Sequence, residues 1–175
     1  MGFAPGSSDF AHKPDFGCSL KKLHYGKYTM FTNILVVCVG NICRSPMAEA
    51  LLRHELGNPE GVKIHSAGVG AMVDEPAQDE AQALMLELGL DISAHRARQL
   101  GPNLLKEAEL VLVMETAHKA AVTAIDNTAR GKVQLLGEWR SMEVPDPYGR
   151  PREDYEHALR LIKVGVADWV ERIKK

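Results

Sequence analysis

A continuous run of apolar, mostly β-branched residues near position 33 constrains the fold more than any other feature of the sequence. The run reads Asn33-Ile-Leu-Val-Val-Cys38. A strand that is apolar on both faces is typical of the centre of a parallel sheet, because helices cover both faces of such a sheet. A second run, Glu109-Leu-Val-Leu-Val-Met114, has the same character. We therefore expect two central strands of one parallel sheet.

Segments of helical periodicity alternate with these strands. Pro46 stands where a first helical turn accepts proline, and Gly57 and Gly89 each follow a helical segment at the position where glycine ends a helix. The other expected elements are helices at 46–57, 77–89, 116–125 and 155–173 and strands at 62–66 and 132–136. This alternation predicts a single α/β domain with a four-stranded parallel sheet and helices on both faces. Such folds bind ligands at the carboxyl ends of their strands.

The composition argues against several classes of protein. The chain has 175 residues, enough for one domain with a sizeable core. Its net charge is −2 and no stretch is dense in lysine or arginine, so we expect no nucleic-acid partner. The longest apolar run, Ile34–Val39, is far shorter than the ~20 residues that span a bilayer, and we expect no membrane insertion. Three cysteines make no disulfide framework in a chain of this length, which favours a reducing, cytoplasmic setting.

Residues 1–30 differ in character from residues 31–175. They are rich in glycine, proline and serine and contain no apolar segment of signal-peptide length. We interpret them as an N-terminal extension that is flexible or foreign to the native protein. They also hold five of the chain's ten aromatic residues (Phe3, Phe10, Phe16, Tyr25 and Tyr28), which is unusual for a disordered tail. Docking of these aromatic side chains on the domain or on a second copy therefore remains an alternative.

The chemistry is expected in the loop that follows the first strand. Seven residues connect Cys38 to Pro46, enough for the loop to curl into a ring whose backbone N–H groups point inward and bind an anion. Gly40 permits a positive φ, and Asn41 tolerates one. Arg44 can return its planar guanidinium to the ring and bind two oxyanion oxygens.

Cys38 stands at the floor of this predicted anion site. A helix N-terminus and a nearby cation favour the thiolate form of cysteine. A thiolate beneath a bound phosphate is a nucleophile aimed at phosphorus. Ser45 can donate a hydrogen bond to this sulfur when it departs.

A second motif, Val144-Pro-Asp-Pro-Tyr148, lies far along the chain. Prolines on both sides hold Asp146 in extended geometry. Cleavage of a phosphomonoester needs an acid to protonate the leaving oxygen and then a base to activate water. A rigidly presented carboxylate can do both.

These two motifs resemble those of the low-molecular-weight protein tyrosine phosphatases. Within that family they are most similar to the bacterial enzymes that act on tyrosine kinases of exopolysaccharide export. The resemblance covers roughly residues 31–175 and implies that Cys38 is the nucleophile, Arg44 the phosphate ligand and Asp146 the general acid and base. It implies no metal and no organic cofactor. The partner it implies is a phosphotyrosine protein, such as a tyrosine autokinase, and the enzyme is expected to be a monomer or weak dimer.

The resemblance also assigns supporting and substrate-binding residues. The network that supports the loop maps onto Asn41, Ser45, Ser66 and His95. The residues expected to surround the substrate are Val39, Gly40, Asn41, Ile42, Cys43, Ser45, Met72 and Tyr148. The loop of residues 69–74 lacks the aromatic residue that many members use as a wall, so Met72 is the nearest bulky candidate there. Tyr148 should then be the main aromatic contact for a phosphotyrosine ring.

The residues argue against three alternative functions. An arsenate reductase on the same fold needs further cysteines downstream of the loop, and residues 44–175 contain none. A phosphocarrier lacks the loop arginine and has no use for Asp146, because it must keep its phosphoryl group from water. The intact set of Cys38, Arg44 and Asp146 argues against a non-catalytic phosphate-binding module. No pair of cysteines or histidines has metal-ligand spacing. Other chemically active side chains are interpreted structurally: His54, His118 and His157 as exposed helix residues, and Trp139 and Trp169 as core.

Overall fold

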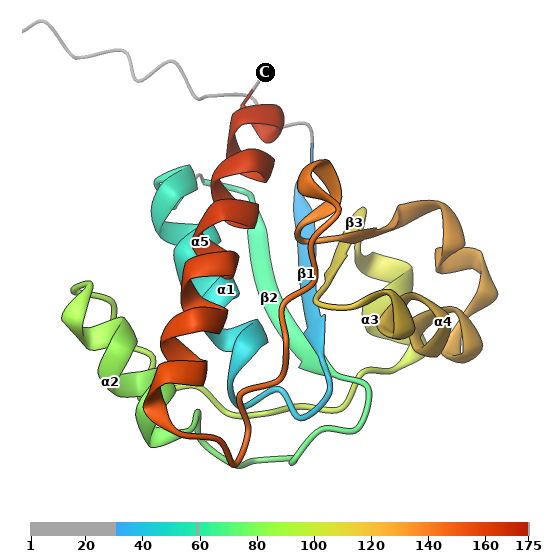
Figure 1. The fold of residues 1–175 in the computed structure, drawn as a ribbon. Helices are drawn as coiled ribbons and strands as arrows, with labels where there is room; N and C mark the ends of the chain where they lie inside the picture. Colours follow the sequence, from blue (N-terminus) through green and yellow to red (C-terminus); the bar gives the residue numbers. More distant parts are fainter. Residues whose placement is uncertain (1–30, 59, 175) are drawn as a thin grey trace, which may run out of the picture.

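The computed structural model describes residues 31–58 and 60–174 (Figure 1). The predicted N-terminal extension, residues 1–30, lies outside the described residues. Within them, no helix is long and apolar enough to cross a membrane.

Four parallel strands form one sheet, as the sequence predicts. They are β1 (Asn33–Cys38), β2 (Lys63–Gly68), β3 (Leu110–Val113) and β4 (Val133–Leu135), in the spatial order β2-β1-β3-β4. Cys38 is paired with Gly68, and Val37 with Val113. The carboxyl ends of the three longer strands therefore meet at one edge of the sheet.

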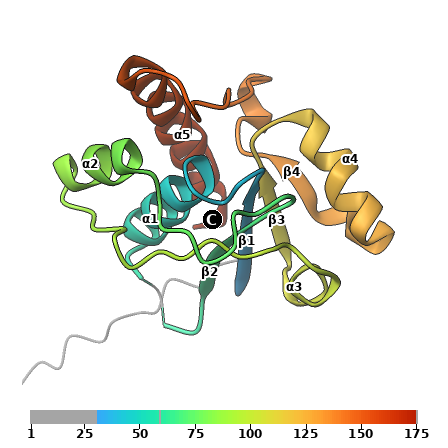
Figure 2. The ribbon, with the colours of Figure 1, turned by 90° about the horizontal axis from the view of Figure 1, so that it is seen from below.

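Within the described residues, five α-helices cover the two faces of this sheet. They are α1 (Arg44–Leu56), α2 (Asp79–Glu87), α3 (Pro102–Glu107), α4 (Thr116–Ile125) and α5 (Arg152–Ile173). Two short 3-10 helices, η1 (Asn127–Lys132) and η2 (Glu138–Arg140), flank β4. Helices α1, α2 and α5 lie on one side of the sheet, and α3 and α4 lie on the other (Figure 2). The predicted three-layer arrangement is confirmed.

Alternate side chains of β1 enter two separate cores. Ile34 and Val36 pack under α1 and α5, whereas Leu35 and Val37 pack under α3 and α4. Each of these side chains is fully buried. Burial of one such side chain contributes roughly 1.5–3 kcal/mol, so β1 is fixed from both sides and holds the end of the strand at Cys38 in place.

Two expectations about single side chains are wrong. Trp139 is half exposed rather than part of the core, whereas Trp169 is buried as expected. His118 is buried on α4, whereas His54 and His157 are exposed as expected. In addition, the sequence pattern gave no indication of α3, which has only six residues and buries one of them, Leu105.

Candidate active site

The loop between β1 and α1 turns the carbonyl groups of five successive residues outward. Each carbonyl accepts a hydrogen bond from the chain around the loop: Val69 N to Cys38 O at 3.0 Å, Gly70 N to Val39 O at 3.1 Å, Met72 N to Gly40 O at 3.0 Å, His95 Nε2 to Asn41 O at 2.7 Å and Gln78 N to Ile42 O at 2.8 Å. A C=O and the N–H of the same trans peptide point to opposite sides. The N–H groups of residues 39–43 therefore point into the ring, and that of Asn41 lies 3.3 Å from Cys38 Sγ. This is the anion cradle that the loop length predicts.

The backbone of this loop turns at Asn41, where φ is +58°. Gly40, where a positive φ would also be tolerated, does not adopt one. A tight approach occurs instead at Gly68, where a Cβ would lie 2.3 Å from the carbonyl oxygen of Val39. Gly68 thus allows β2 to continue directly beneath the loop.

The buried side chain of Asn41 links the loop to three neighbouring segments. Its Nδ2 donates to Ser45 Oγ at 2.8 Å and to Ser66 Oγ at 2.9 Å, and its Oδ1 accepts from the backbone N–H of Arg98 at 2.9 Å. All the hydrogen-bonding capacity of the amide hydrogens is used. Since a buried polar group without a partner costs about 1–3 kcal/mol, this network specifies one loop conformation.

A chain of hydrogen bonds runs from Asn41 to the Cys38 sulfur. Ser45 Oγ accepts from Asn41 and lies 3.0 Å from Cys38 Sγ, where either the hydroxyl or the thiol can be the donor. Ser66 likewise accepts from Asn41 and donates to Glu49 Oε2 at 2.7 Å. Because a thiolate only accepts hydrogen bonds, the Ser45 hydroxyl is placed to donate to the sulfur whenever Cys38 is an anion.

Arg44 begins α1 and its side chain is almost completely buried, at 1% exposure. Its Nη1 donates to Glu115 Oε1 and to the carbonyl oxygen of Val144, the latter at 3.0 Å, and its Nη2 donates to Asp146 Oδ2 at 2.6 Å. A buried guanidinium is stable only when charged partners compensate for lost hydration, and the two carboxylates do this. They also fix the plane of the guanidinium beside the loop.

Asp146 lies in the extended segment between η2 and α5. Its second oxygen, Oδ1, accepts a hydrogen bond from the N–H of Tyr148 at 3.2 Å, as in an Asx turn. The carboxylate faces the loop across a cavity of about 160 Å³. The residues that line this cavity are Cys38, Val39, Gly40, Ile42, Cys43, Arg44, Gly70, Met72, Asp146 and Tyr148.

Most of the predicted site residues line this cavity, whereas a few lie behind the loop and support it. Met72 and Tyr148 stand at the rim, with 40% and 52% of their surface exposed. Asn41 and Ser45, predicted among the substrate contacts, do not line the cavity and lie behind the loop with Ser66. His95 is also outside the cavity and holds the carbonyl of Asn41.

Cys43 lines the same cavity as Cys38 but has a different environment. Burial is the main cause that raises the pKa of the Cys43 thiol to about 12, and a hydrogen bond to Tyr155 Oη at 3.7 Å opposes it. Cys43 is therefore a thiol at neutral pH. Cys38, by contrast, accepts a hydrogen bond from the backbone N–H of Asn41 and shares one with the Ser45 hydroxyl.

Three polar side chains that contact the network around the loop were not among the predicted site residues. Glu49 accepts from Ser66, and its position four residues after Ser45 on one helix was a usable signal. Glu115 follows β3, whose carboxyl end lies beside that of β1, and this topology could have linked it to Arg44. His118 lies one turn further along α4, with Nε2 3.8 Å from Glu115 Oε1. Burial, with Arg44 nearby, lowers the pKa of His118, and its Nδ1 has no partner among the described residues.

No group of three or more metal-ligating side chains occurs within residues 31–58 and 60–174.

Comparison with known proteins fits this geometry. The family model for low-molecular-weight phosphotyrosine protein phosphatases matches residues 33–175. The chain belongs to this family. The enzyme class predicted from the motifs, a cysteine-based protein tyrosine phosphatase, is thereby confirmed at the level of the family.

The similarity covers nearly the whole length of individual relatives. A protein named "Probable low molecular weight protein-tyrosine-phosphatase EpsP" from Ralstonia nicotianae is 46% identical over 145 residues, 83% of this chain and 98% of its own. The structure of Vibrio vulnificus Wzb in complex with benzylphosphonate has a TM-score of 0.77 and 39% identity, and covers 81% of this chain and 99% of its own. The YwlE arginine phosphatase from Geobacillus stearothermophilus has a TM-score of 0.74 and 33% identity, and covers 81% of this chain and 92% of its own.

Proposed function

We propose that residues 31–175 form a phosphatase domain that hydrolyses phosphotyrosine through a phosphocysteine intermediate at Cys38. The observation that carries the proposal is one small cavity that holds the Cys38 sulfur at its floor, inward N–H groups around it, and Arg44 and Asp146 at its side. Each of these groups supplies a different requirement of phosphoryl transfer: a nucleophile, oxyanion donors, a cation and an acid.

In the first step the phosphate group binds within the ring. The N–H groups of residues 39–43 and the guanidinium of Arg44 bind its non-bridging oxygens, where charge is concentrated in the transition state. The Cys38 thiolate attacks phosphorus, the bond between phosphorus and the tyrosine oxygen breaks, and Asp146 gives its proton to that oxygen. The products of this step are tyrosine and an S-phosphocysteine.

In the second step water hydrolyses the phosphocysteine. Asp146, now a carboxylate, removes a proton from the attacking water, and the sulfur leaves as a thiolate. The Ser45 hydroxyl, 3.0 Å from the sulfur, donates to the thiolate that forms. Inorganic phosphate is released, and the enzyme returns to its starting protonation state.

The rim supports an aromatic substrate. Tyr148 is half exposed beside the cavity and can contact a phosphotyrosine ring by offset or edge-to-face packing, and Met72 lines the same cavity. The relatives named protein-tyrosine-phosphatase, such as EpsP, support a phosphotyrosine protein as substrate. That this protein is a bacterial tyrosine autokinase of exopolysaccharide export is part of our proposal and follows from the resemblance of the motifs. A thiolate nucleophile also needs a reducing compartment, which supports a cytoplasmic location.

The experiment that tests this function compares turnover of four substrates by the purified full chain. We expect phosphotyrosine peptide and para-nitrophenyl phosphate to be hydrolysed, with phosphoserine peptide and phosphoarginine peptide at least about tenfold slower in kcat/KM. A preference for phosphoarginine peptide would indicate an arginine phosphatase, as YwlE is named. Thiol-dependent reduction of arsenate would indicate an arsenate reductase. Phosphate binding without any turnover would indicate a non-catalytic module.

A further inference from the structure

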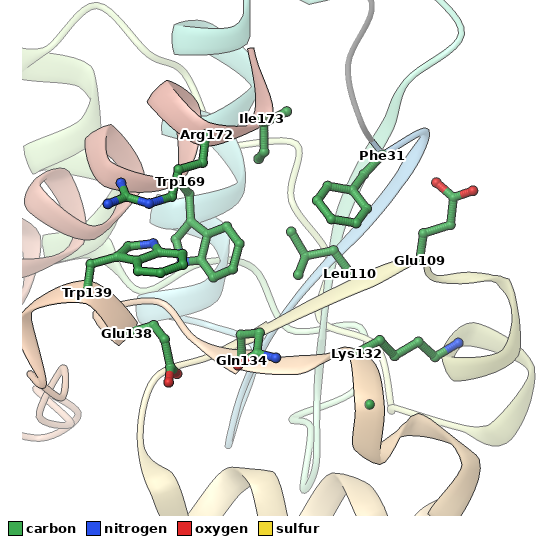
Figure 3. A pocket seen from close by; sticks show the side chains of 11 residues that line it. Phe31, Glu109, Leu110, Lys132, Gln134, Glu138, Trp139, Trp169, Arg172 and Ile173 are labelled. Carbon is green, nitrogen blue, oxygen red and sulfur yellow. The ribbon is translucent and has the colours of Figure 1, made fainter. Parts of the chain in front are cut away.

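A second, larger cavity lies at the opposite end of the sheet from Cys38. Its volume is about 700 Å³, and Figure 3 shows the residues around it. They come from the start of β3, from β4 and η2, and from the last turns of α5. The lining residues include Phe31, Gln134, Trp139, Trp169 and Arg172.

The apolar wall of this cavity includes both tryptophans of the chain. Trp169 is buried, and its Nε1 donates to the carbonyl of Leu135 at 3.1 Å, so its ring is fixed. The Trp139 ring lies 5.7 Å from that of Trp169, with the guanidinium carbon of Arg172 4.0 Å from the ring centroid of Trp139. Even with these two neighbours, half of Trp139 remains exposed. An exposed indole beside an apolar cavity of this size marks a surface that an apolar group can cover.

The chain enters the domain at the edge of this cavity. Glu109 Oε2 accepts hydrogen bonds from Thr32 N at 2.5 Å, Thr32 Oγ1 at 3.0 Å and Asn33 N at 3.3 Å. The carbonyl of Thr32 accepts from Lys63 N at 2.8 Å. These contacts fix the backbone just after Phe31, which itself lines the cavity. The described chain therefore begins at this cavity.

The segment that precedes Phe31 is the part of the chain outside the family similarity. The matched relatives cover 97–99% of their own length but only 82–83% of this chain, and the family model begins at residue 33. Five of the ten aromatic residues lie in this segment. Tyr28 is three residues from Phe31, a reach of about 10 Å for extended chain, which suits a cavity that begins at Phe31.

The charged groups at the rim already have partners within the domain. Glu138 is bound by Lys119 and by the N–H of Leu135, and Glu109 is bound by Thr32. The side chain of Gln134, by contrast, has no hydrogen-bond partner among the described residues and lies within the cavity (Figure 3). An apolar wall with one unpaired amide favours a side chain that has an aromatic ring and a single polar group at its end. Tyrosine is such a side chain.

We propose that residues 25–30 dock in this cavity and that the Tyr28 ring packs there against Trp139, with its hydroxyl toward Gln134. The contact is intramolecular and mainly apolar. It covers the exposed tryptophan, far from the catalytic cavity.

Tryptophan fluorescence of the full chain tests this proposal, because the only two tryptophans of the chain line the cavity. In Tyr28→Ala we expect acrylamide quenching to rise about twofold, the emission to shift to longer wavelength and Tm to fall by several degrees. The kcat/KM for para-nitrophenyl phosphate should stay within about twofold of wild type. The double control Phe3→Ala/Phe10→Ala, in the same segment but distant along the chain, should leave quenching and Tm unchanged.

Three results would overturn the proposal. Equal quenching in Tyr28→Ala and wild type would mean that Tyr28 does not cover Trp139. An equal change in quenching and Tm in the Phe3→Ala/Phe10→Ala control would mean that the contact is not specific to residues 25–30. Quenching that falls as protein concentration rises would assign the cavity to a second copy of the chain. A shift in catalytic activity alone would concern the proposed phosphatase function and not this contact.

Discussion

The two ends of the same sheet are built in opposite ways. At the carboxyl end, buried polar groups such as Asn41, Ser45 and Arg44 are bonded to one another and to backbone groups around a cavity of about 160 Å³. At the amino end, a cavity of about 700 Å³ has an apolar wall that includes Phe31, Trp139 and Trp169, and Trp139 remains half exposed. A site that stabilises developing charge needs donors that are fixed before the substrate arrives, because their reorganisation would otherwise raise the barrier. The amino end has no such requirement and can be completed by an apolar group.

The largest effect is expected from Asp146→Asn, which preserves the shape of the loop and removes the transferable proton. Turnover of phenyl phosphate should fall by roughly 10²–10⁴-fold, the usual range for general acid–base catalysis. The loss should be much smaller for substrates with acidic leaving groups, which need no proton. Steady-state rates across a series of aryl phosphates measure this, and a steeper leaving-group dependence in the variant supports the acid role.

Asp154→Asn is a matched control for this substitution. Asp154 is exposed near the start of α5 and shares a shallow surface cavity with Asp146, but it does not line the cavity that contains Cys38. It should change kcat by less than about twofold. Parallel leaving-group lines for wild type and Asp146→Asn would limit Asp146 to a role in loop shape.

The second largest loss of turnover is expected from Arg44→Lys. A lysine cannot bind Glu115, the carbonyl of Val144 and Asp146 together, nor offer a planar pair of donors to phosphate. Loss of fixed oxyanion donors costs about 10²–10³-fold in kcat. Arg160→Lys, on the exposed face of α5, is the control and should leave kcat unchanged. A comparably mild effect of both would exclude Arg44 from phosphate binding.

The pair Asn41→Ala and Asn41→Gly separates backbone strain from side-chain bonding. Both variants leave Ser66, Ser45 and the Arg98 N–H without their amide partner, at about 1–3 kcal/mol for each unsatisfied buried group. Alanine also has to adopt φ of +58°, which costs roughly 1–2 kcal/mol and which glycine tolerates. Urea denaturation should therefore show both variants destabilised, with alanine worse by about 1 kcal/mol. Equal stability of the two variants would mean that the backbone conformation carries no strain.

The smallest effect concerns His65, which ties β2 to the same network. Its Nδ1 accepts from Arg98 Nη2 at 2.6 Å, and its Nε2 lies 2.7 Å from Asn33 Oδ1. Burial, with Arg98 nearby, lowers the pKa of His65 from 6.5 to about 4. Between these values the unfolded chain binds a proton that the folded chain does not, so stability is lost as pH falls from 6.5 to 4. His65 should contribute about 1–3 kcal/mol to this loss.

Denaturation midpoints measured between pH 7 and pH 4 check the His65 contribution. His65→Gln should remove that part of the slope, whereas His157→Gln, at an exposed position on α5, should preserve it. An unchanged slope in His65→Gln would assign the pH dependence to other groups.

The sequence predicts a helix or strand correctly where the pattern within that segment alone determines its structure. The apolar run at Ile34 predicts β1 because all but its first residue is buried, and the spacing from Tyr155 to Ile173 predicts α5 because those residues form its buried face. Cys38, Arg44 and Asp146 form a rare combination in sequence, and the structure brings them to one cavity. Their catalytic roles, the N-terminal extension and the monomeric or weakly dimeric state remain predictions.

The missed features depend on tertiary packing. Trp139 was expected in the core, but it lies on η2, where Arg172 and Trp169 cover only part of its ring. His118 is buried because α4 packs over the end of β3 beside Glu115, which no spacing within α4 reveals. The outward carbonyls of the loop depend on Val69, Met72 and Gln78, backbone donors that any residue except proline could supply.

The phosphorylated enzyme itself is the most direct test of the proposed chemistry. Wild-type enzyme and Asp146→Asn should be mixed with a rapidly cleaved aryl phosphate, quenched within milliseconds and digested for mass spectrometry. We predict a phosphoryl group on Cys38, more abundant in Asp146→Asn because hydrolysis of the intermediate is slowed, and absent from Cys38→Ser, which should turn over less than about a hundredth as fast as wild type. Phosphorylation at another residue, or product formation by Cys38→Ser at near the wild-type rate, would contradict a Cys38 nucleophile.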